Sequence, residues 1–281
     1  MRKIFAAICA AALLMTGCGG DNASKPAPTK EKTIIGVITH LNASEIEYNE
    51  LMKKLEKSYR PSKANLGADY KFFDKMNDMQ MALDAGQIDM LSTYQNVADY
   101  MLQRTDNREI LPTKKILSDS FCFAMREGDT MLQSDLNKAI KAMTGDGTLN
   151  KLTKQYITDL KNGAEPPAVP IAHIDGADTI KVAVTGDLPP FDMILSDGTP
   201  AGFSTAVLAE ISRRINKNIE LVSVDSAARA SILSSKGADV VFWVAVPKDS
   251  HLIPANIDQP PGIAISDPYY NDNIVHIGLK K

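Results

Sequence analysis

Side chains suited to non-covalent binding follow the points where the sequence predicts strands to end. Ser92 and Thr93 come after a short apolar run near residue 90 and offer hydroxyl groups. Trp243, the single tryptophan, lies at the end of a predicted strand at 240–244 and offers a ring for stacking. In an open α/β sheet, ligands bind at the carboxyl ends of the strands. These residue types favour a polar cleft, although a place in the core is an equally good interpretation of Trp243.

The turn after the first predicted strand, residues 34–38, adds three candidate ligand-binding residues. Thr39 offers a hydroxyl group, His40 an imidazole ring and Asn42 an amide. A single histidine also suits a structural or solvated position. Asn42 also suits the N-cap of the helix that the following apolar spacing predicts.

The turn at 185–191 follows a second β-branched strand and contributes Asp187, Leu188 and Phe191. Asp187 suits contact with a cation, and it also suits capping of its own loop. Phe191 suits ligand contact or packing beneath the turn. Arg229, on a predicted helix, suits an anionic group or a solvated surface.

Motifs for enzymatic or metal chemistry are missing from the sequence. The four histidines are scattered without the paired spacing of metal ligands. The sequence contains no G-x-S-x-G, no phosphate-binding loop and no C-x-x-C. The net charge of −3 gives no reason to expect a nucleic-acid partner. We therefore expect a binding protein with no catalytic residue, metal or cofactor.

The first 32 residues predict export. Arg2 and Lys3 precede an apolar run at 4–14 that is too short for a comfortable membrane span. We expect a signal peptide over 1–17, followed over 18–32 by a flexible tether rich in Gly, Ser, Pro and Lys.

The segment Met15-Thr16-Gly17-Cys18 resembles the lipobox of bacterial lipoproteins. The resemblance implies cleavage before Cys18 and a diacylglyceryl thioether on its sulfur. It therefore implies a protein anchored to a membrane on the extracytoplasmic side of the cell envelope. A plain signal peptide with an incidental cysteine is the alternative. Cys122 is then the single cysteine of the folded body, and we expect it to be buried.

Strands and helices alternate after the tether, which predicts an α/β fold with mostly parallel sheets flanked by helices. A Pro-rich linker at 163–178 separates residues 33–162 from residues 179–281. The second half repeats features of the first, such as the leucine-to-aspartate spacing of 83–89 at 233–239. This repetition predicts two related lobes. We favour a shared cleft because each half alone buries little core; two separate small domains are the alternative.

The segment KVAVTGDLPPFDMILSDGTPAGF at 181–203 resembles the opening of the type II periplasmic solute-binding proteins, specifically the family-3 amino-acid receptors of ABC transporters. Its Pro-Pro-Phe turn, Asp-Gly hairpin and Gly-Phe before a helix match in order and spacing. Residues 125–157 resemble the closing segment of the same family. The resemblance implies capture of a small polar solute between two lobes and delivery to permease subunits in the membrane. A non-transporting sensor or surface lipoprotein is the alternative, and a dehydratase-like enzyme is a remote third.

Two departures from the family leave the ligand open. Family members hold a substrate carboxylate with an arginine about ten residues past an aspartate, beside a Ser/Thr run. After Asp239 the Ser/Thr positions fall on Trp243, Val244 and Val246, and the arginine position falls near His251. The sequence thus shows no carboxylate clamp, so amines, peptides and aromatic metabolites are candidate ligands as well as amino acids. The chain also has two opening-like segments and no full inserted lobe.

Overall fold

A computed structural model of the chain describes residues 32–59, 67–112, 117–161, 163–248, 253 and 255–280. The predicted signal peptide, Cys18 and all of the predicted tether except Lys32 lie outside these residues. From Lys32 onward the chain forms one compact unit. In the part of the chain described, no helix has the length and apolar character needed to cross a membrane.

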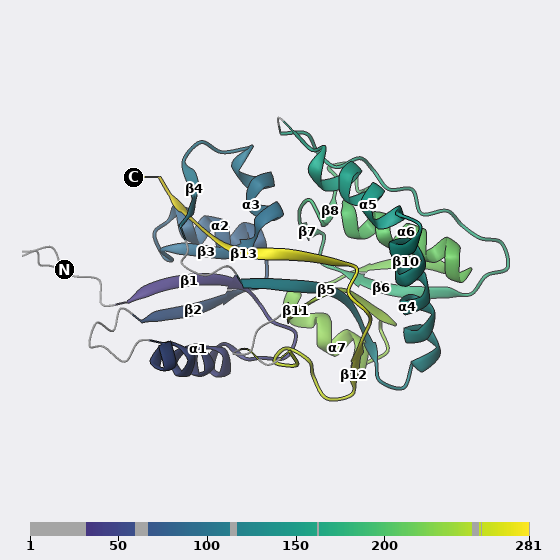
Figure 1. The fold of residues 1–281 in the computed structure, drawn as a ribbon, viewed down its shortest axis with the longest axis horizontal. Coiled ribbons are helices and arrows are strands. Elements are labelled where there is room, and N and C mark those ends of the chain that lie inside the picture. The colour runs from purple at the N-terminus through teal and green to yellow at the C-terminus, as the bar shows by residue number, and fades with distance from the viewer. Residues whose placement is uncertain are drawn as a thin grey trace, which may run out of the picture. The chain divides into compact units, whose positions relative to one another are not determined.

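Strands and helices alternate through both halves of the sequence (Figure 1). The first half contains β1 (Thr33–Ile38), α1 (Glu45–Tyr59), β2 (Ala68–Phe73), α2 (Met76–Asp84), β3 (Met90–Tyr94), α3 (Gln95–Leu102), β4 (Arg108–Leu111), β5 (Leu117–Arg126), α4 (Thr130–Gly145), α5 (Thr148–Thr153) and a π-helical turn (Lys154–Thr158). The second half contains β6 (Thr179–Val184), β7 (Asp187–Leu188), β8 (Asp192–Ile194), β9 (Pro200–Ala201), α6 (Phe203–Ile215), β10 (Asn218–Ser223), a 3-10 turn (Ser226–Ala228), α7 (Arg229–Ser234), β11 (Val240–Lys248), β12 (Ile263–Ile265) and β13 (Tyr270–Leu279).

One mixed sheet in the order β10-β6-β11-β5-β13-β3-β1-β2 runs through the body, with β12 beside β5 and β4 beside β13. β1 pairs in parallel with β2 and β3, and β6 pairs in parallel with β10 and β11. The two parallel groups, β2-β1-β3 and β10-β6-β11, thus have the same order. The predicted α/β class with parallel strands flanked by helices is confirmed.

The two halves exchange their last long strands in the middle of this sheet (Figure 1). β5 comes from the first half but pairs with β11, and β13 comes from the second half but pairs with β3 and β4; all these pairs are antiparallel. β5 and β13 also pair with each other. The halves therefore share one sheet, and the division into 33–162 and 179–281 with a linker between them stays a proposal about the organisation of the chain.

Asp89 and Asp239 make the same contacts in the two halves. The carboxylate of Asp89 accepts a hydrogen bond from the Ile34 backbone N–H at 2.8 Å, and the Asp89 N–H donates to the Ile34 carbonyl oxygen. Asp239 makes both bonds with Lys181, at 3.0 and 2.8 Å. Each aspartate thus fixes the start of a strand of its parallel group, which agrees with a structural role for this repeated residue.

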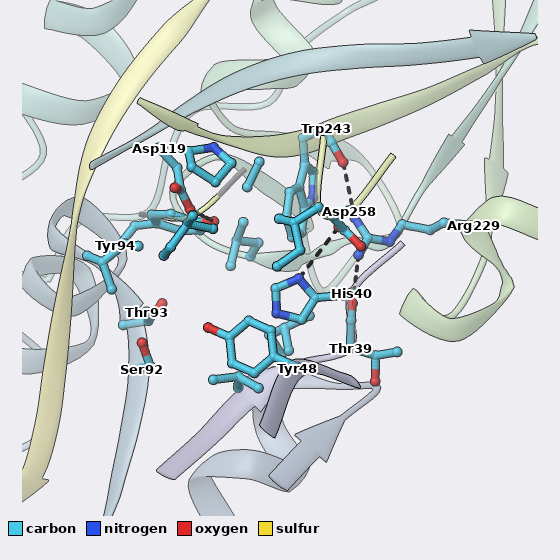
Figure 2. A pocket seen from close by; sticks show the side chains of 18 residues that line it. Thr39, His40, Tyr48, Ser92, Thr93, Tyr94, Asp119, Arg229, Trp243 and Asp258 are labelled. Atoms are coloured by element: carbon cyan, nitrogen blue, oxygen red, sulfur yellow. Dashed lines mark hydrogen bonds and ion pairs between the residues drawn. The ribbon is translucent and has the colours of Figure 1, made fainter. Parts of the chain in front are cut away.

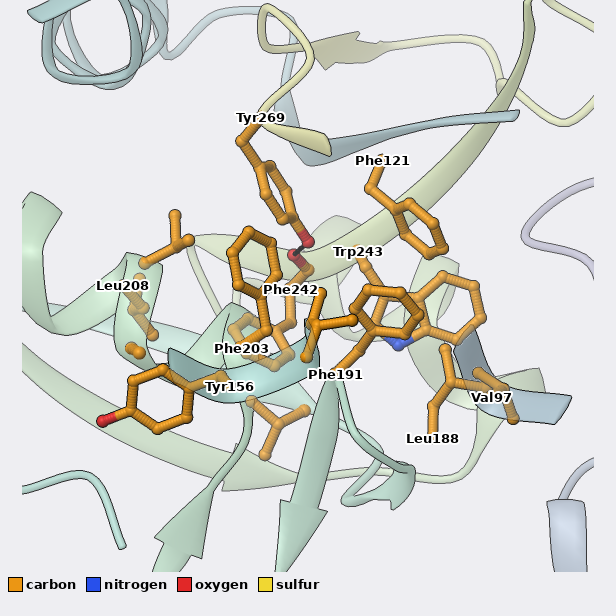
Figure 3. Close-up of a cluster of buried hydrophobic side chains, with 14 of the residues drawn as sticks. Val97, Phe121, Tyr156, Leu188, Phe191, Phe203, Leu208, Phe242, Trp243 and Tyr269 are labelled. Atoms are coloured by element: carbon orange, nitrogen blue, oxygen red, sulfur yellow. Dashed lines mark hydrogen bonds between the residues drawn. The ribbon is translucent and has the colours of Figure 1, made fainter. Parts of the chain in front are cut away.

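Aromatic side chains fill the core between the two parallel groups (Figure 3). The ring centroids of Phe121 and Phe191 lie 4.9 Å apart, and those of Phe191 and Tyr270 lie 5.3 Å apart. Phe191 is 1% exposed, so it packs beneath its turn. Cys122 is buried beside Phe121 as expected, and this burial raises the pKa of its thiol to about 12.

The turn that carries the family-like motif is held by a buried carboxylate and a glycine. Asp192 accepts hydrogen bonds from the Thr185 N–H, the Thr185 hydroxyl and the Gly186 N–H, each at 3.0 Å. Burial raises the pKa of Asp192 to about 6, although these hydrogen bonds oppose the rise. Gly202 precedes α6 with φ at +104°, and a Cβ atom there would lie 2.5 Å from the Phe191 carbonyl oxygen. The Gly-Phe pair is therefore required by backbone packing.

Candidate functional site

A cavity of about 110 Å³ lies where the carboxyl ends of β1 and β3 face β11 and α7 (Figure 2). An engineered cavity of about 150 Å³ holds a benzene molecule, so this space suits a small solute. Its polar and aromatic lining consists of Thr39, His40, Tyr48, Ser92, Thr93, Tyr94, Asp119, Arg229, Trp243 and Asp258. Its apolar lining consists of Val37, Ile38, Leu188, Ala245, Pro247, Ile253, Ile257 and Ile274.

Seven of the ten residues predicted to bind a ligand line this cavity. They come from both halves of the sequence and are Thr39, His40, Ser92, Thr93, Leu188, Arg229 and Trp243. Their contact with a ligand stays a prediction. The tryptophan lies at the border of core and cavity, because its side chain also packs in the aromatic core.

The other three predicted residues lie outside the cavity lining and have structural contacts instead. Asp187 accepts a hydrogen bond from the Met76 N–H at 3.0 Å, so it caps the first turn of α2. The backbone N–H of Asn42 donates to Asp258 at 2.7 Å while the residue is exposed. Phe191 belongs to the core. For Asn42 and Asp187 the sequence predicted the turn but not the direction of the side chain, whereas the packing of Phe191 beneath its turn was one of the two positions considered from the sequence.

Arg229 is buried, and its guanidinium joins three segments. Nη2 donates to the Thr39 carbonyl oxygen at 2.8 Å, Nη1 to that of Trp243 at 3.1 Å, and Nε to that of Ser226 at 3.2 Å. Its Cζ atom lies 4.5 Å from the centroid of the Trp243 ring. Burial lowers the pKa of Arg229, and the negative charge of Asp258 opposes this. The solvated surface position considered from the sequence is therefore wrong.

Asp258 fixes the turn after β1. Its carboxylate accepts hydrogen bonds from the N–H groups of Leu41, Asn42 and Ala43 at 2.8, 2.7 and 3.3 Å. The Nδ1 atom of His40 lies 3.6 Å from the same carboxylate. Burial raises the pKa of Asp258, but His40 and the backbone N–H groups more than offset this and lower it below its ordinary value. Asp258 is thus an ionised carboxylate with its acceptor sites in use.

Asp119 is the second carboxylate of the cavity, and it has far fewer donors. The Tyr94 hydroxyl donates to it at 3.1 Å, which is the one side-chain hydrogen bond it makes with the described residues. Burial raises the pKa of Asp119 to about 6, with the charge of Asp258 adding to the rise and Tyr94 and His40 opposing it. Asp119 therefore has acceptor capacity left for another molecule.

Two buried polar atoms among the lining residues have no hydrogen-bond partner in the described part of the chain. They are the Thr93 hydroxyl and the Trp243 indole N–H, on side chains that are 6% and 5% exposed. Leaving such a group unsatisfied costs about 1–3 kcal/mol. Unpartnered groups at a cavity wall are accordingly what a ligand-binding site requires.

Four of the polar and aromatic lining residues were not predicted as site residues: Tyr48, Tyr94, Asp119 and Asp258. Tyr94 directly follows Ser92 and Thr93, so its position at the strand end was a usable signal. Tyr48 lies one helical turn into α1, where its spacing resembled that of a core residue. The sequence around Asp258 has no feature that predicts its return to the turn after β1.

The sequence model of the bacterial extracellular solute-binding proteins, family 3, matches residues 63–159 and 180–249. These segments cover more than half of the chain. The chain belongs to this family. The match includes the closing-like segment and the opening-like segment. In this family-3 protein α4 and α5, which lie within the closing-like segment, pack against α6, which begins at the end of the opening-like segment.

Solved structures resemble this family-3 protein only distantly. The ligand-binding component of an ABC-type import system from Staphylococcus aureus, solved with zinc bound, is 14% identical with a TM-score of 0.43, over 88% of this chain and 65% of that one. The B. pertussis BvgS periplasmic domain is 11% identical with a TM-score of 0.40, over 89% of this chain and 37% of that one. AbpA from Streptococcus pneumoniae, an amino acid ABC transporter substrate-binding protein bound to L-arginine, is 11% identical with a TM-score of 0.41, over 90% of this chain and 83% of that one. The chain thus spans just under two thirds of the length of the Staphylococcus aureus protein and just over one third of the length of the BvgS periplasmic domain. No curated protein matches it.

Replacing Asp258 with asparagine in this family-3 protein is expected to lower the free energy of unfolding by about 2 kcal/mol at pH 7. An amide has one acceptor oxygen and presents an N–H₂ group to backbone donors, so at least one N–H of the turn after β1 loses its partner. Urea unfolding measures the loss. The exposed Asp267→Asn variant is the matched control and is expected to unfold like the wild type.

The same pair of variants has a defined pH dependence. Because the folded-state pKa of Asp258 is lowered, its contribution is complete above the unfolded-state value of about 3.9 and is lost as the pH falls through the folded-state pKa. The stability difference between Asp258→Asn and the wild type is therefore expected to shrink as the pH falls below about 4. A difference that grows between pH 4 and pH 2 would contradict the assigned contacts.

Proposed function

We propose that this protein captures a small polar solute, an amino acid or a related compound, and delivers it to the permease subunits of an ABC importer. The observation that carries the proposal is a cavity, lined from both halves of a family-3 chain, with unpartnered polar groups buried in its wall. Binding sites for small molecules combine such an apolar enclosure with a few placed polar groups.

Capture and release require the cavity to open. The contacts that hold its walls together join segments that are distant in the sequence. Arg229 binds the carbonyl of Thr39, Asp258 binds the turn after β1, and Asp187 caps α2. A solute that bridges both walls would add to these contacts and shift the population toward the closed form. Release would follow when a permease favours the open form.

The predicted location supports this role. A lipid on Cys18 and a tether over 18–32 would hold the receptor close to its membrane partner, on the extracytoplasmic side of the cell envelope. The sequence of the first 32 residues is the support for this part of the proposal. On the same anchored body, a sensor or surface interaction protein is the alternative function.

A thermal unfolding screen of the purified mature protein tests the proposal. The panel contains amino acids, short peptides, amines and aromatic acids. A solute present at a hundred times its Kd is expected to add about 2.7 kcal/mol to the free energy of unfolding. For a body of this size that is a rise of about 5–10 °C in Tm. Failure of every compound to shift Tm would favour the sensor or interaction function, and turnover of a bound compound would favour an enzyme.

Thr93→Val separates binding from stability in that screen. The substitution keeps the shape of the side chain and removes a hydroxyl group that has no partner among the described residues. We expect Tm without solute to be unchanged or higher, because an unsatisfied buried group is removed. The Tm shift caused by the solute is expected to fall. A loss of stability without solute would show that the hydroxyl has a structural partner.

A further inference from the structure

The charged groups of the cavity restrict what the solute can carry. Holding a carboxylate requires a cationic side chain with free donors. Arg229 already donates to three backbone carbonyls and lies over the Trp243 ring. His40 is 3.6 Å from the carboxylate of Asp258. The described lining contains no other cationic residue, so it offers no clamp for a carboxylate.

The negative charges of the cavity differ in how they are compensated. Asp258 has three backbone N–H donors and His40 beside it. Asp119 has the single phenol of Tyr94. Asp119 is half-buried, and a carboxylate removed even partly from water is stabilised by a partner of opposite charge or by several donors. Asp119 therefore lacks a positive partner among the described residues, and a positive group of the solute would provide one.

The remaining wall suits a cation. The side chains of Tyr48, Tyr94 and Trp243 line the same space. Aromatic rings attract cations through their negative faces, and because Arg229 already lies over the Trp243 ring, Tyr48 and Tyr94 are the rings that could serve the solute. The unpartnered Thr93 hydroxyl can accept a hydrogen bond from an ammonium group, and the unpartnered Trp243 N–H can donate to a neutral oxygen. An amine that also carries a neutral oxygen would thus provide hydrogen-bond partners for Asp119, the Thr93 hydroxyl and the Trp243 N–H.

Resting on the function proposed above, we propose that the solute is a small organic ammonium ion without a carboxylate, with Asp119 as its counter-ion. The aromatic side chains surround its hydrocarbon part, and Trp243 donates to a hydroxyl, ether or amide oxygen. This solute differs from an α-amino acid in its net charge, which is +1 where that of a neutral amino acid is zero.

Two matched series of probes test the proposal by calorimetric titration at pH 7.5 with the mature protein. One series is valinol, valine and isovalerate, and the other is phenylalaninol, phenylalanine and 3-phenylpropionate. Within a series the body is constant while the charged groups change from ammonium, to ammonium with carboxylate, to carboxylate alone. We expect the amino alcohol of at least one series to bind at least tenfold more tightly than its amino acid, and the acid not to bind.

Asp119→Asn shows whether the carboxylate is responsible. The amide oxygen can still accept the hydrogen bond from Tyr94, so we expect the variant to fold, which thermal unfolding checks. Affinity for the amino alcohol is expected to fall at least thirtyfold. The exposed Asp267→Asn variant, with the same change of group and charge, is expected to bind like the wild type.

The pH dependence gives a readout that a merely structural role would not move. The charged and titratable groups around Asp119 are Tyr94 on β3, Tyr48 on α1, His40 after β1, Asp258, Arg229 on α7 and the cross-strand Asp272 on β13. The pKa of Asp119 is raised to about 6, and the amino alcohols stay protonated below pH 8. Affinity is therefore expected to fall about tenfold from pH 7.5 to pH 5 in the wild type, and much less in Asp119→Asn.

The outcomes separate this inference from the function on which it rests. Binding of an amino acid or an acid at least as tight as that of the amino alcohol, unaffected by Asp119→Asn, would overturn the inference and leave solute binding intact. Amino alcohol binding with no change in Asp119→Asn would also overturn it. Absence of binding across both series and the broader panel would overturn both.

Discussion

Arg229→Ala is expected to lower the free energy of unfolding by about 3–5 kcal/mol, because it removes one side of a buried charged network. Three backbone carbonyls, those of Thr39, Ser226 and Trp243, lose their charged donor together. The wall of the cavity also loses the contact between the guanidinium and the Trp243 ring. Urea unfolding at pH 7, with the slope of the transition compared between variants, measures the loss.

Two further variants serve as controls for Arg229→Ala: one removes an exposed arginine, and the other keeps the positive charge at position 229. Arg213→Ala removes an exposed arginine of α6 whose ion pair is with Glu210, and we expect a change within about 0.5 kcal/mol. Arg229→Lys keeps the charge but replaces the planar group that reaches three carbonyls by a single ammonium, so an intermediate loss is expected. A loss below about 1 kcal/mol for Arg229→Ala would show that the three carbonyls find other donors.

Gly202→Ala is expected to cost at least about 3 kcal/mol, since steric overlap and backbone strain act together. The added Cβ would lie 2.5 Å from the Phe191 carbonyl oxygen and 2.8 Å from that of Pro190. Both neighbours are backbone atoms, and Phe191 is fixed in the aromatic core. The start of α6 must therefore shift. The midpoint of urea unfolding measures this effect.

Gly198→Ala is the matched control for the same turn region. Its φ of +85° is also unfavourable for alanine, but a Cβ there has no atom within 4 Å. We expect a cost of about 1 kcal/mol from conformation alone. Equal losses in the two variants would mean that the close approach to Phe191 contributes nothing.

Most secondary structure was predictable because it follows local rules. The β-branched run before Gly186 formed β6, and the turn at Asp197-Gly198 connects the hairpin of β8 and β9. The exchange of β5 and β13 was not predictable, because the composition of a strand does not specify which distant strand it pairs with. Their partners are decided by which edge each can reach after the helices have packed, and local sequence does not encode that.

The site was predictable where strand ends determined it. Thr39 and Thr93 line the cavity because β1 and β3 end there, whereas Trp243 lines it from the middle of β11, which runs on to Lys248 beyond the predicted strand at 240–244. Asp187 lies outside the cavity lining because its side chain caps α2, where it binds the backbone of Met76, 111 residues away in the sequence. Asp119 was not predicted as a site residue, because its place at the cavity depends on the cross-strand pairing of β5. The contacts that determine which side chains face the cavity thus join residues far apart in the sequence, and local sequence patterns do not predict such contacts.

The position of β13 governs the order in which this chain can fold. Tyr94 of β3 pairs with Ile274, so β3 has an open edge until a strand from the far end of the sequence arrives. Pairings of such sequence separation form slowly, because a long loop must close before they contribute any stability. An unpaired strand edge is also a template for association with other chains. The exchange that joins the two halves into one sheet therefore leaves the edge of β3 unpaired until residues 270–279 have taken their place.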